Sequence, residues 1–216
     1  MPLGAGLHAT FRVAANATFN TAGTPADAGF FWDLTVALSG DKAVLVETQP
    51  LAGTWFELKY AGATYASPIS DTLLGVFEVA PDGLLLRAVV SPTDSVGATE
   101  LKYDPPAKLL SFPLSAAANW TTTSTVAGRL NGFTWTQTEK YDSTVDKQGE
   151  VLTPFARFPV QRVKTILTRT VGFTPTVTRS FLFVTECFGT VATITSQAGE
   201  TSTEFSSAAE VRRLTP

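Results

Sequence analysis

Residues 131–145 read Asn-Gly-Phe-Thr-Trp-Thr-Gln-Thr-Glu-Lys-Tyr-Asp-Ser-Thr-Val, and their alternation is the clearest structural signal in the chain. Mostly large side chains occupy every second position, and threonine, lysine and aspartate stand between them. Because successive side chains of a strand point to opposite faces of a sheet, the alternation predicts a long antiparallel strand with one buried and one solvated face. Asn131-Gly132 at its start favours a tight hairpin, since both residues accept a positive φ. Residues 119–126 are therefore expected to form the partner strand.

The same period of two recurs along the rest of the chain. The segments that show it are 30–39, 43–47, 54–60, 76–79, 84–90, 161–171, 176–184 and 190–195. Turn-forming residues separate them, and a short closing strand is expected near 211–214. Only 114–119 and 206–213 suit a helical turn or two. The pattern predicts an all-β, antiparallel fold with few or no helices, built as a strongly curved sheet or incomplete barrel.

Composition narrows the class of protein. Of the 216 residues, 44% are hydrophobic and 16% are charged, which excludes intrinsic disorder. The net charge is −3, with 16 Lys and Arg against 19 Asp and Glu, which excludes a polybasic nucleic-acid binder. No stretch approaches the roughly 20 apolar residues that a membrane-spanning helix needs, so no membrane span is expected.

We expect residues 1–216 to form a single all-β domain. The segment 103–107 contains two adjacent prolines, Pro105 and Pro106, which cannot donate hydrogen bonds to a sheet. A central strand is not expected there, and the segment is a candidate subdomain boundary. Each half alone would be a sheet with two faces to cover, which favours one continuous domain.

Cys187 is the only cysteine and His8 the only histidine. A single thiol permits neither an intramolecular disulfide nor a metal site of several thiolates, so no cofactor or metal is expected. Cys187 lies in the apolar segment 181–189, where a buried core thiol is expected. The alternative, a nucleophile, would need His8 as its base, and His8 lies in the first ten residues, where chain ends are commonly poorly ordered.

Aromatic side chains on the expected strands are candidates for the lining of a ligand pocket. Curved sheets and barrels enclose such pockets, and a lipid or another apolar small molecule is the expected ligand. The alternative is that the rings only fill the core, as inward-facing aromatic side chains commonly do. The six candidate lining residues are Trp120, Phe133, Trp135, Tyr141, Phe181 and Phe183.

Charged residues suggest two further hypotheses. A group of cations between positions 157 and 179 could hold an anion, but a solvated face with cross-strand ion pairs is the preferred interpretation. The cations are Arg157, Arg162, Lys164, Arg169 and Arg179. A hydrolase would need two carboxylates at a defined separation, and Asp33 and Glu186 are the candidates to test. No spacing in the sequence pairs these acids, so no catalytic residue is assigned.

The most distinctive motif of the chain begins at Thr153. From there to Val163 the sequence reads T-P-x-x-x-F-P-V-x-R-V, and Phe112-Pro113-Leu114 and Trp120 precede it. Over about residues 108–197 this arrangement resembles a family of bacterial exported proteins of unknown function. The resemblance implies an exported, lipoprotein-like β-protein with a curved sheet similar to that of lipoprotein carriers. It brings no catalytic residues.

These observations favour a non-enzymatic exported protein of the periplasm or cell envelope that binds an apolar ligand in a concave, aromatic-lined sheet. Residues 1–6 have neither the positive start nor the apolar run of a signal peptide, so an export signal is expected to lie outside this sequence. Two alternatives stay open. One is a structural, adhesion or assembly module that meets a protein partner through its sheet edges, and the other is a hydrolase of envelope polymers.

Overall fold

The computed structural model describes residues 3–216. Met1 and Pro2, which begin the segment 1–6 discussed above, lie outside the described residues. The described residues form β-strands, turns and loops and contain no helix, which confirms the all-β prediction. The strands are β1 (His8–Thr18), β2 (Thr24–Ala26), β3 (Gly29–Asp33), β4 (Lys42–Glu47), β5 (Tyr65–Pro68), β6 (Leu74–Ala80), β7 (Gly83–Val90), β8 (Glu100–Ser111), β9 (Asn119–Leu130), β10 (Phe133–Leu152), β11 (Arg157–Val171), β12 (Thr174–Thr185), β13 (Gly189–Ser196) and β14 (Ser207–Thr215).

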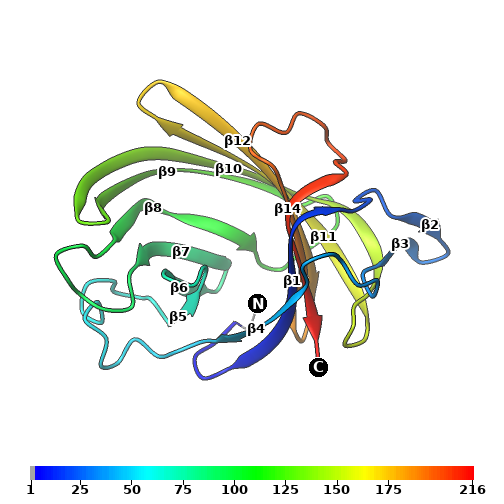
Figure 1. Cartoon of the computed structure of the whole chain (residues 1–216), viewed down its shortest axis with the longest axis horizontal. Helices are drawn as coiled ribbons and strands as arrows, with labels where there is room; N and C mark the ends of the chain where they lie inside the picture. The colour runs from blue at the N-terminus through cyan, green and yellow to red at the C-terminus, as the bar shows by residue number, and fades with distance from the viewer. Residues whose placement is uncertain (1–2) are drawn as a thin grey trace.

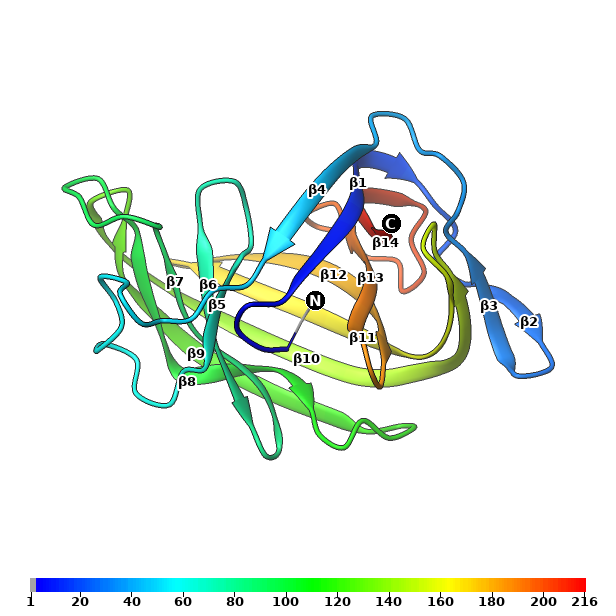
Figure 2. The ribbon, with the colours of Figure 1, turned by 90° about the horizontal axis from the view of Figure 1, so that it is seen from below.

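The main sheet is antiparallel and curls nearly into a closed barrel (Figure 1 and Figure 2). From β5 to β14, neighbours in the sheet are consecutive in sequence, and β1 and then β4 extend the sheet beyond β14. The two ends of the sheet meet at one isolated bridge, where Gln49 and Ala66 exchange backbone hydrogen bonds of 2.8 and 2.9 Å. The predicted incomplete barrel is therefore confirmed, and we call this junction between β4 and β5 the seam.

β10 is the long strand that the alternation predicts. The turn before it places Asn131 and Gly132 at φ values of 51° and 82°, which confirms the hairpin with β9. After Val145 the register with β11 shifts at a bulge, and the last four residues of β10, 149–152, pair in parallel with β3. A bulge inserts one extra residue and so reverses the alternation of the side chains. Odd-numbered residues of β10 therefore point into the barrel before the bulge and out of it after the bulge. Tyr141 accordingly packs inside the barrel, whereas Val151 packs outside.

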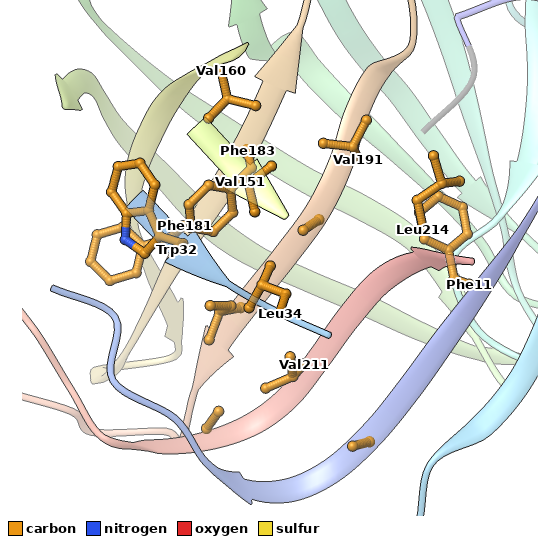
Figure 3. Packing of buried hydrophobic residues seen from close by; sticks show 14 of the residues in the cluster. Phe11, Trp32, Leu34, Val151, Val160, Phe181, Phe183, Val191, Val211 and Leu214 are labelled. Carbon is orange, nitrogen blue, oxygen red and sulfur yellow. The ribbon is translucent and has the colours of Figure 1, made fainter. Parts of the chain in front are cut away.

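Buried apolar side chains form three clusters. The inner cluster fills the barrel and includes Tyr103 and Val163. The outer cluster is centred on the outside of β11–β14, where Trp32 of β3 lies against Phe181 and Phe183 (Figure 3). The third cluster covers the outside of β5–β7 beneath the segment 51–63. Both faces of much of the sheet are thus buried.

Residues 54–60 form consecutive turns, so the strand expected there is wrong. Backbone amides donate to carbonyls three residues earlier, as from Lys59 N to Phe56 O at 3.0 Å. Phe56 and Tyr60 are buried against the outside of β5–β7, whereas Leu58 between them is exposed. Apolar residues four positions apart fit both the alternation of a strand and the spacing of successive turns. The sequence pattern therefore does not distinguish the two structures, and the chain adopts turns here.

Two further boundaries differ from the predictions. The strand expected at 30–39 ends at Asp33, because its carboxylate accepts hydrogen bonds from the backbone N and the hydroxyl of Thr35 and turns the chain. The helical turn expected at 206–213 is wrong, since β14 is paired with β1 on one side and with β13 on the other. Pairing on both sides overrides a weak local propensity.

β8 runs through Pro105 and Pro106, where the sequence predicts an interruption. Its ladder with β7 skips residues 103–106, and its ladder with β9 ends at Asp104. The two prolines therefore occupy positions where the strand forms no ladder hydrogen bond on either side. A missing N–H has little cost there, which explains how a central strand accommodates them.

Candidate functional site

A cavity of about 310 Å³ lies inside the barrel. Most of its wall is apolar and comes from side chains spread around the sheet, among them Leu84, Leu110 and Leu182. Val46 of β4 and Ile69, which follows β5, also line it. Because these two residues lie on either side of the seam, the cavity borders the place where the barrel is closed by a single bridge.

Polar groups occupy one part of the cavity wall, on neighbouring strands from β11 to β14. They include Thr165, Ser180, Thr193, Glu210 and Arg212. The register keeps them close together, since Thr165 pairs with Ser180 and Thr193 pairs with Arg212. An apolar wall with a few convergent polar groups is typical of sites that bind small molecules.

Glu139 lies on the inner face of β10, buried, and accepts four hydrogen bonds. Its Oε2 accepts from the hydroxyls of Tyr141 at 2.6 Å and Tyr103 at 3.1 Å. Its Oε1 accepts from Nε2 of Gln137 at 2.7 Å and Nε of Arg169 at 2.8 Å. Burial is the largest cause that raises the pKa of Tyr103 and of Tyr141 above the usual range of a phenol, so both hydroxyls remain donors near neutral pH. Tyr141 also lines the cavity, which joins this cluster to its wall.

Three of the six predicted lining residues lie inside the barrel. Tyr141 lines the cavity, and Trp120 and Trp135 are partly buried against the inner cluster. The indole of Trp120 donates to the carbonyl of Lys108 at 3.0 Å, and that of Trp135 donates to Gln137 at 3.0 Å. Of the six, Tyr141 is therefore the residue that the structure places on the cavity wall.

The other three predicted residues lie elsewhere. Phe181 and Phe183 belong to the outer cluster, with the ring of Trp32 centred 5.1 Å from that of Phe183 (Figure 3). Leu182, which lies between them, lines the cavity. The predicted alternation is therefore present in β12, but the face that points into the barrel is the one that carries Leu182 and not the one that carries the two phenylalanines. Phe133 is 78% exposed at the tip of the β9–β10 hairpin. The sequence did not separate these environments because both faces of β12 are apolar.

Arg162 is fully buried on the outer face of β11, between two carboxylates. Its guanidinium donates to Asp146 at 2.7 and 3.0 Å and to Glu204 at 2.7 and 3.1 Å. Nη1 also donates to the carbonyl of Thr21 at 2.6 Å, and the ring of Phe181 lies 4.0 Å away. Burial opposes the charge, but the hydrogen bonds to both acids outweigh it and raise the pKa of Arg162. The cluster fastens the loop after β13 and the segment before β2 to the barrel.

The expectation of a solvated cationic face is correct for some of these residues and wrong for Arg162. Arg157 is exposed and pairs with Glu150 at 3.3 Å. Arg169 is half exposed and pairs with Glu139, its direct cross-strand neighbour. Arg162 is covered by segments distant in sequence, which a pattern along one strand does not reveal.

Glu204 is expected to make the fold sensitive to acid. Burial opposes its ionisation, but hydrogen bonds from Arg162, Lys147 and Thr21 outweigh it and lower the pKa of Glu204 from 4.5 to about 2. Because the folded-state pKa is depressed, the stabilisation is present above pH 4.5 and is lost as the pH falls towards 2. We expect this group to contribute about 2 kcal/mol of that loss, allowing for its partial exposure.

Urea unfolding above and below this pH window measures the effect. The variant Glu204→Gln has no carboxylate to protonate, so its stability is expected to change less across the window than that of the wild type. An equal loss in both proteins would show that Glu204 is not the responsible group.

A second cavity, of about 750 Å³, lies at the end of the barrel that holds the β10–β11 and β12–β13 turns. Leu3, Glu150 and Glu186 are among its lining residues. Of the two acids singled out for a hydrolase, Glu186 therefore lies on this wall, whereas Asp33 is exposed at the end of β3 and is not part of it. The structure does not bring these two carboxylates together in this cavity.

Cys187 and His8 both differ from expectation. Cys187 is exposed in the turn after Thr185, so the prediction of a buried core thiol is wrong, because the apolar segment 181–189 continues past the end of β12. His8 is exposed but begins β1, where it pairs with Glu47. The prediction of a poorly ordered position is therefore also wrong, since strand pairing fixes the backbone there.

Residues 3–216 contain no group of three or more His, Cys, Asp and Glu side chains that could hold a metal ion. In the same residues no helix has the length and hydropathy needed to cross a membrane. Comparison with known proteins gives no matching family model, no matching curated protein and no matching solved structure.

Proposed function

We propose that this protein is a non-enzymatic, exported protein of the cell envelope that binds a lipid or another apolar small molecule inside its barrel. The observation that carries the proposal is the interior cavity of about 310 Å³ with its largely apolar wall. That volume lies at the lower end of the range for small-molecule sites. Apolar ligand surface buried there contributes about 25 cal/mol per Å² to binding before the costs of association. Export is supported by the resemblance of the motif that begins at Thr153 to exported bacterial proteins.

The seam supports a route into the cavity. Neighbouring strands elsewhere in the barrel are joined by ladders, whereas β4 and β5 are joined by the single bridge between Gln49 and Ala66. Val46 and Ile69, which flank the bridge, line the cavity. Separating the strands at the seam breaks fewer backbone hydrogen bonds than separating any other pair, so it is the least costly place for a ligand to pass.

Uptake of the neutral fluorescent dye N-phenyl-1-naphthylamine tests the proposal. We expect saturable binding, and we expect Leu167→Trp to weaken it about tenfold or more, because the larger ring occupies the cavity that Leu167 lines. Thr168→Trp is the matched control, since this neighbour on β11 faces the other side of the sheet. Ser180→Leu fills the same cavity with less bulk and serves if the tryptophan variant does not fold.

Three outcomes decide between the interpretations. Dye binding that is lost in Leu167→Trp and kept in Thr168→Trp supports the interior site. Equal binding by both variants would place the dye elsewhere and contradict the proposal. A wild-type protein that takes up no dye, and that carries no lipid in native mass spectrometry after purification, would also contradict it.

A second candidate is an assembly module that meets a protein partner. Phe133 and Phe173 are strongly exposed at the tips of the β9–β10 and β11–β12 hairpins. Both tips lie at the same end of the barrel, because β11 ends where β10 begins. Exposed apolar side chains gathered at one end favour contact with another macromolecule. A strict monomer in size-exclusion chromatography that also binds the dye would count against this candidate.

A further inference from the structure

We infer that the interior cavity selects ligands that carry a carboxylate group, and that Arg212 holds this group. The inference rests on the proposed function and names the ligand class, an amphipathic molecule with an apolar tail and an anionic head. The tail would lie along the leucine side chains of the wall, and the head would lie on the polar part formed by β13 and β14.

Arg212 occupies the position that such an anchor needs. Among the described residues that line the cavity, it is the only cation and Glu210 is the only anion. Its side chain is 22% exposed, and its guanidinium lies 6.0 Å from the centre of the Phe11 ring, which also lines the cavity. The next residue, Arg213, points to the opposite face of the sheet and pairs there with Asp41. The alternation along β14 thus sends Arg212 inward.

The guanidinium donors of Arg212 are only partly used by the protein. Arg212 forms an ion pair with Glu210, with 3.4 Å between Nε and Oε1, and its side chain donates no hydrogen bond to any residue of the described chain. The buried Arg162, in contrast, donates from Nε, Nη1 and Nη2 to acceptors at 2.6–3.1 Å. A guanidinium with unused donors in a cavity wall can bind a carboxylate through two parallel hydrogen bonds.

Two neighbours favour an anion over a cation as the ligand head. Thr193 is the cross-strand partner of Arg212 and lines the same cavity, so its hydroxyl can donate to a bound carboxylate. Glu210 is 41% exposed, nearly twice as much as Arg212, so its carboxylate can turn into solvent at little cost. A carboxylate ligand would replace Glu210 at Arg212, whereas an ammonium ligand would have to bind beside the less exposed guanidinium.

Three amphiphiles with the same alkyl tail test the inference: dodecanoate, dodecanol and dodecyltrimethylammonium. Each competes with the neutral dye, the two ionic compounds below their micelle concentrations and dodecanol below its solubility limit. We expect dodecanoate to bind about tenfold more tightly than dodecanol, as a charge-assisted bidentate contact allows. Arg212→Gln should reduce dodecanoate affinity to that of dodecanol and leave dodecanol affinity unchanged. Glu210→Gln should strengthen dodecanoate binding about threefold by removing the competing carboxylate.

Arg12→Gln is the matched control, because Arg12 lies on the adjacent β1 and shares the outward face of Arg213. It should leave all three affinities unchanged. Equal affinity for dodecanoate and dodecanol, tighter binding of the ammonium compound, or an equal loss in Arg12→Gln would overturn the role of Arg212 while leaving an apolar site intact. Failure of every amphiphile and of the dye to bind would instead overturn the proposed function itself.

Discussion

Replacing Arg162 with methionine is expected to lower the free energy of unfolding by about 3–5 kcal/mol, a large share of the stability of a domain of this size. The guanidinium is fully buried and neutralises the carboxylates of Asp146 and Glu204. Methionine fills a similar volume but leaves Asp146 without a cation and Glu204 with Lys147 alone. It also removes one of the two donors to the carbonyl of Thr21, the one at 2.6 Å, and leaves the indole of Trp32 at 3.0 Å. Urea unfolding followed by tryptophan fluorescence measures the change, since Trp32 lies beside this cluster.

Lys164→Met is the matched control for this prediction. Lys164 is two residues further along the same face of β11, is partly exposed, and forms no ion pair with any described residue. Its replacement removes the same charge and should change the stability by about 0.5 kcal/mol or less. If both variants lost equal stability, the effect would come from net charge and not from the buried pairs.

The carboxylates themselves provide a second test. Combining Arg162→Met with Asp146→Asn and Glu204→Gln removes the uncompensated charges and should recover a substantial part of the lost stability. A triple variant less stable than Arg162→Met alone would show that Glu204 contributes mainly through its contacts with Lys147 and Thr21.

The strands could be predicted from the sequence, but their inward faces could not. The period of two located β10, β11 and β12 because side-chain alternation is a local property. The direction in which each face points depends on the bulge after Val145 and on the covering layer that Trp32 and Phe205 form outside the barrel. Both are set by distant parts of the chain. The sequence therefore predicts Phe181 inside the barrel, where the structure places Leu182.

The polar anchor of the cavity was missed for a related reason. Arg212 lies in the short closing strand expected near 211–214. That strand is predicted from its apolar residues alone, so the prediction does not say which face its charged side chains occupy. Arg212 and Arg213 look equivalent in the sequence, although one lines the cavity and the other is buried against Asp41. Only the pairing of β14 with β1 and β13 distinguishes the two side chains.

Replacing Glu139 with alanine is expected to cost about 3–5 kcal/mol of unfolding free energy. The carboxylate is buried, and it is the acceptor for the hydroxyls of Tyr103 and Tyr141, both of which are also buried. Alanine removes the acceptor of these two buried hydroxyls, and also that of the partly buried Gln137 and the half-exposed Arg169. A buried donor left unpaired costs about 1–3 kcal/mol, and a cavity of the size of the lost side chain adds to this.

The variant Glu139→Gln distinguishes the contribution of the negative charge of Glu139 from that of its side-chain volume. The amide keeps the volume of the side chain and one oxygen acceptor, but it loses the ion pair with the half-exposed Arg169. We expect this variant to lose about 1–2 kcal/mol, clearly less than the alanine variant. Tyr141→Phe, which removes a single donor, should lose about 1.5–3 kcal/mol because that hydrogen bond is to a charged acceptor.

The same variants link this cluster to ligand binding. Tyr141 lines the cavity and is oriented by its 2.6 Å hydrogen bond to Glu139, so a freed ring should move into the space that the dye occupies. Glu139→Ala is therefore expected to weaken dye binding severalfold at a temperature where it is still folded, whereas Glu139→Gln should bind nearly as the wild type does. Calorimetric unfolding and dye titration on the same samples measure both effects. Equal stability of the two variants would show that Glu139 acts through its charge alone, and unchanged dye affinity in Glu139→Ala would show that the tyrosine is held by packing and not by the carboxylate.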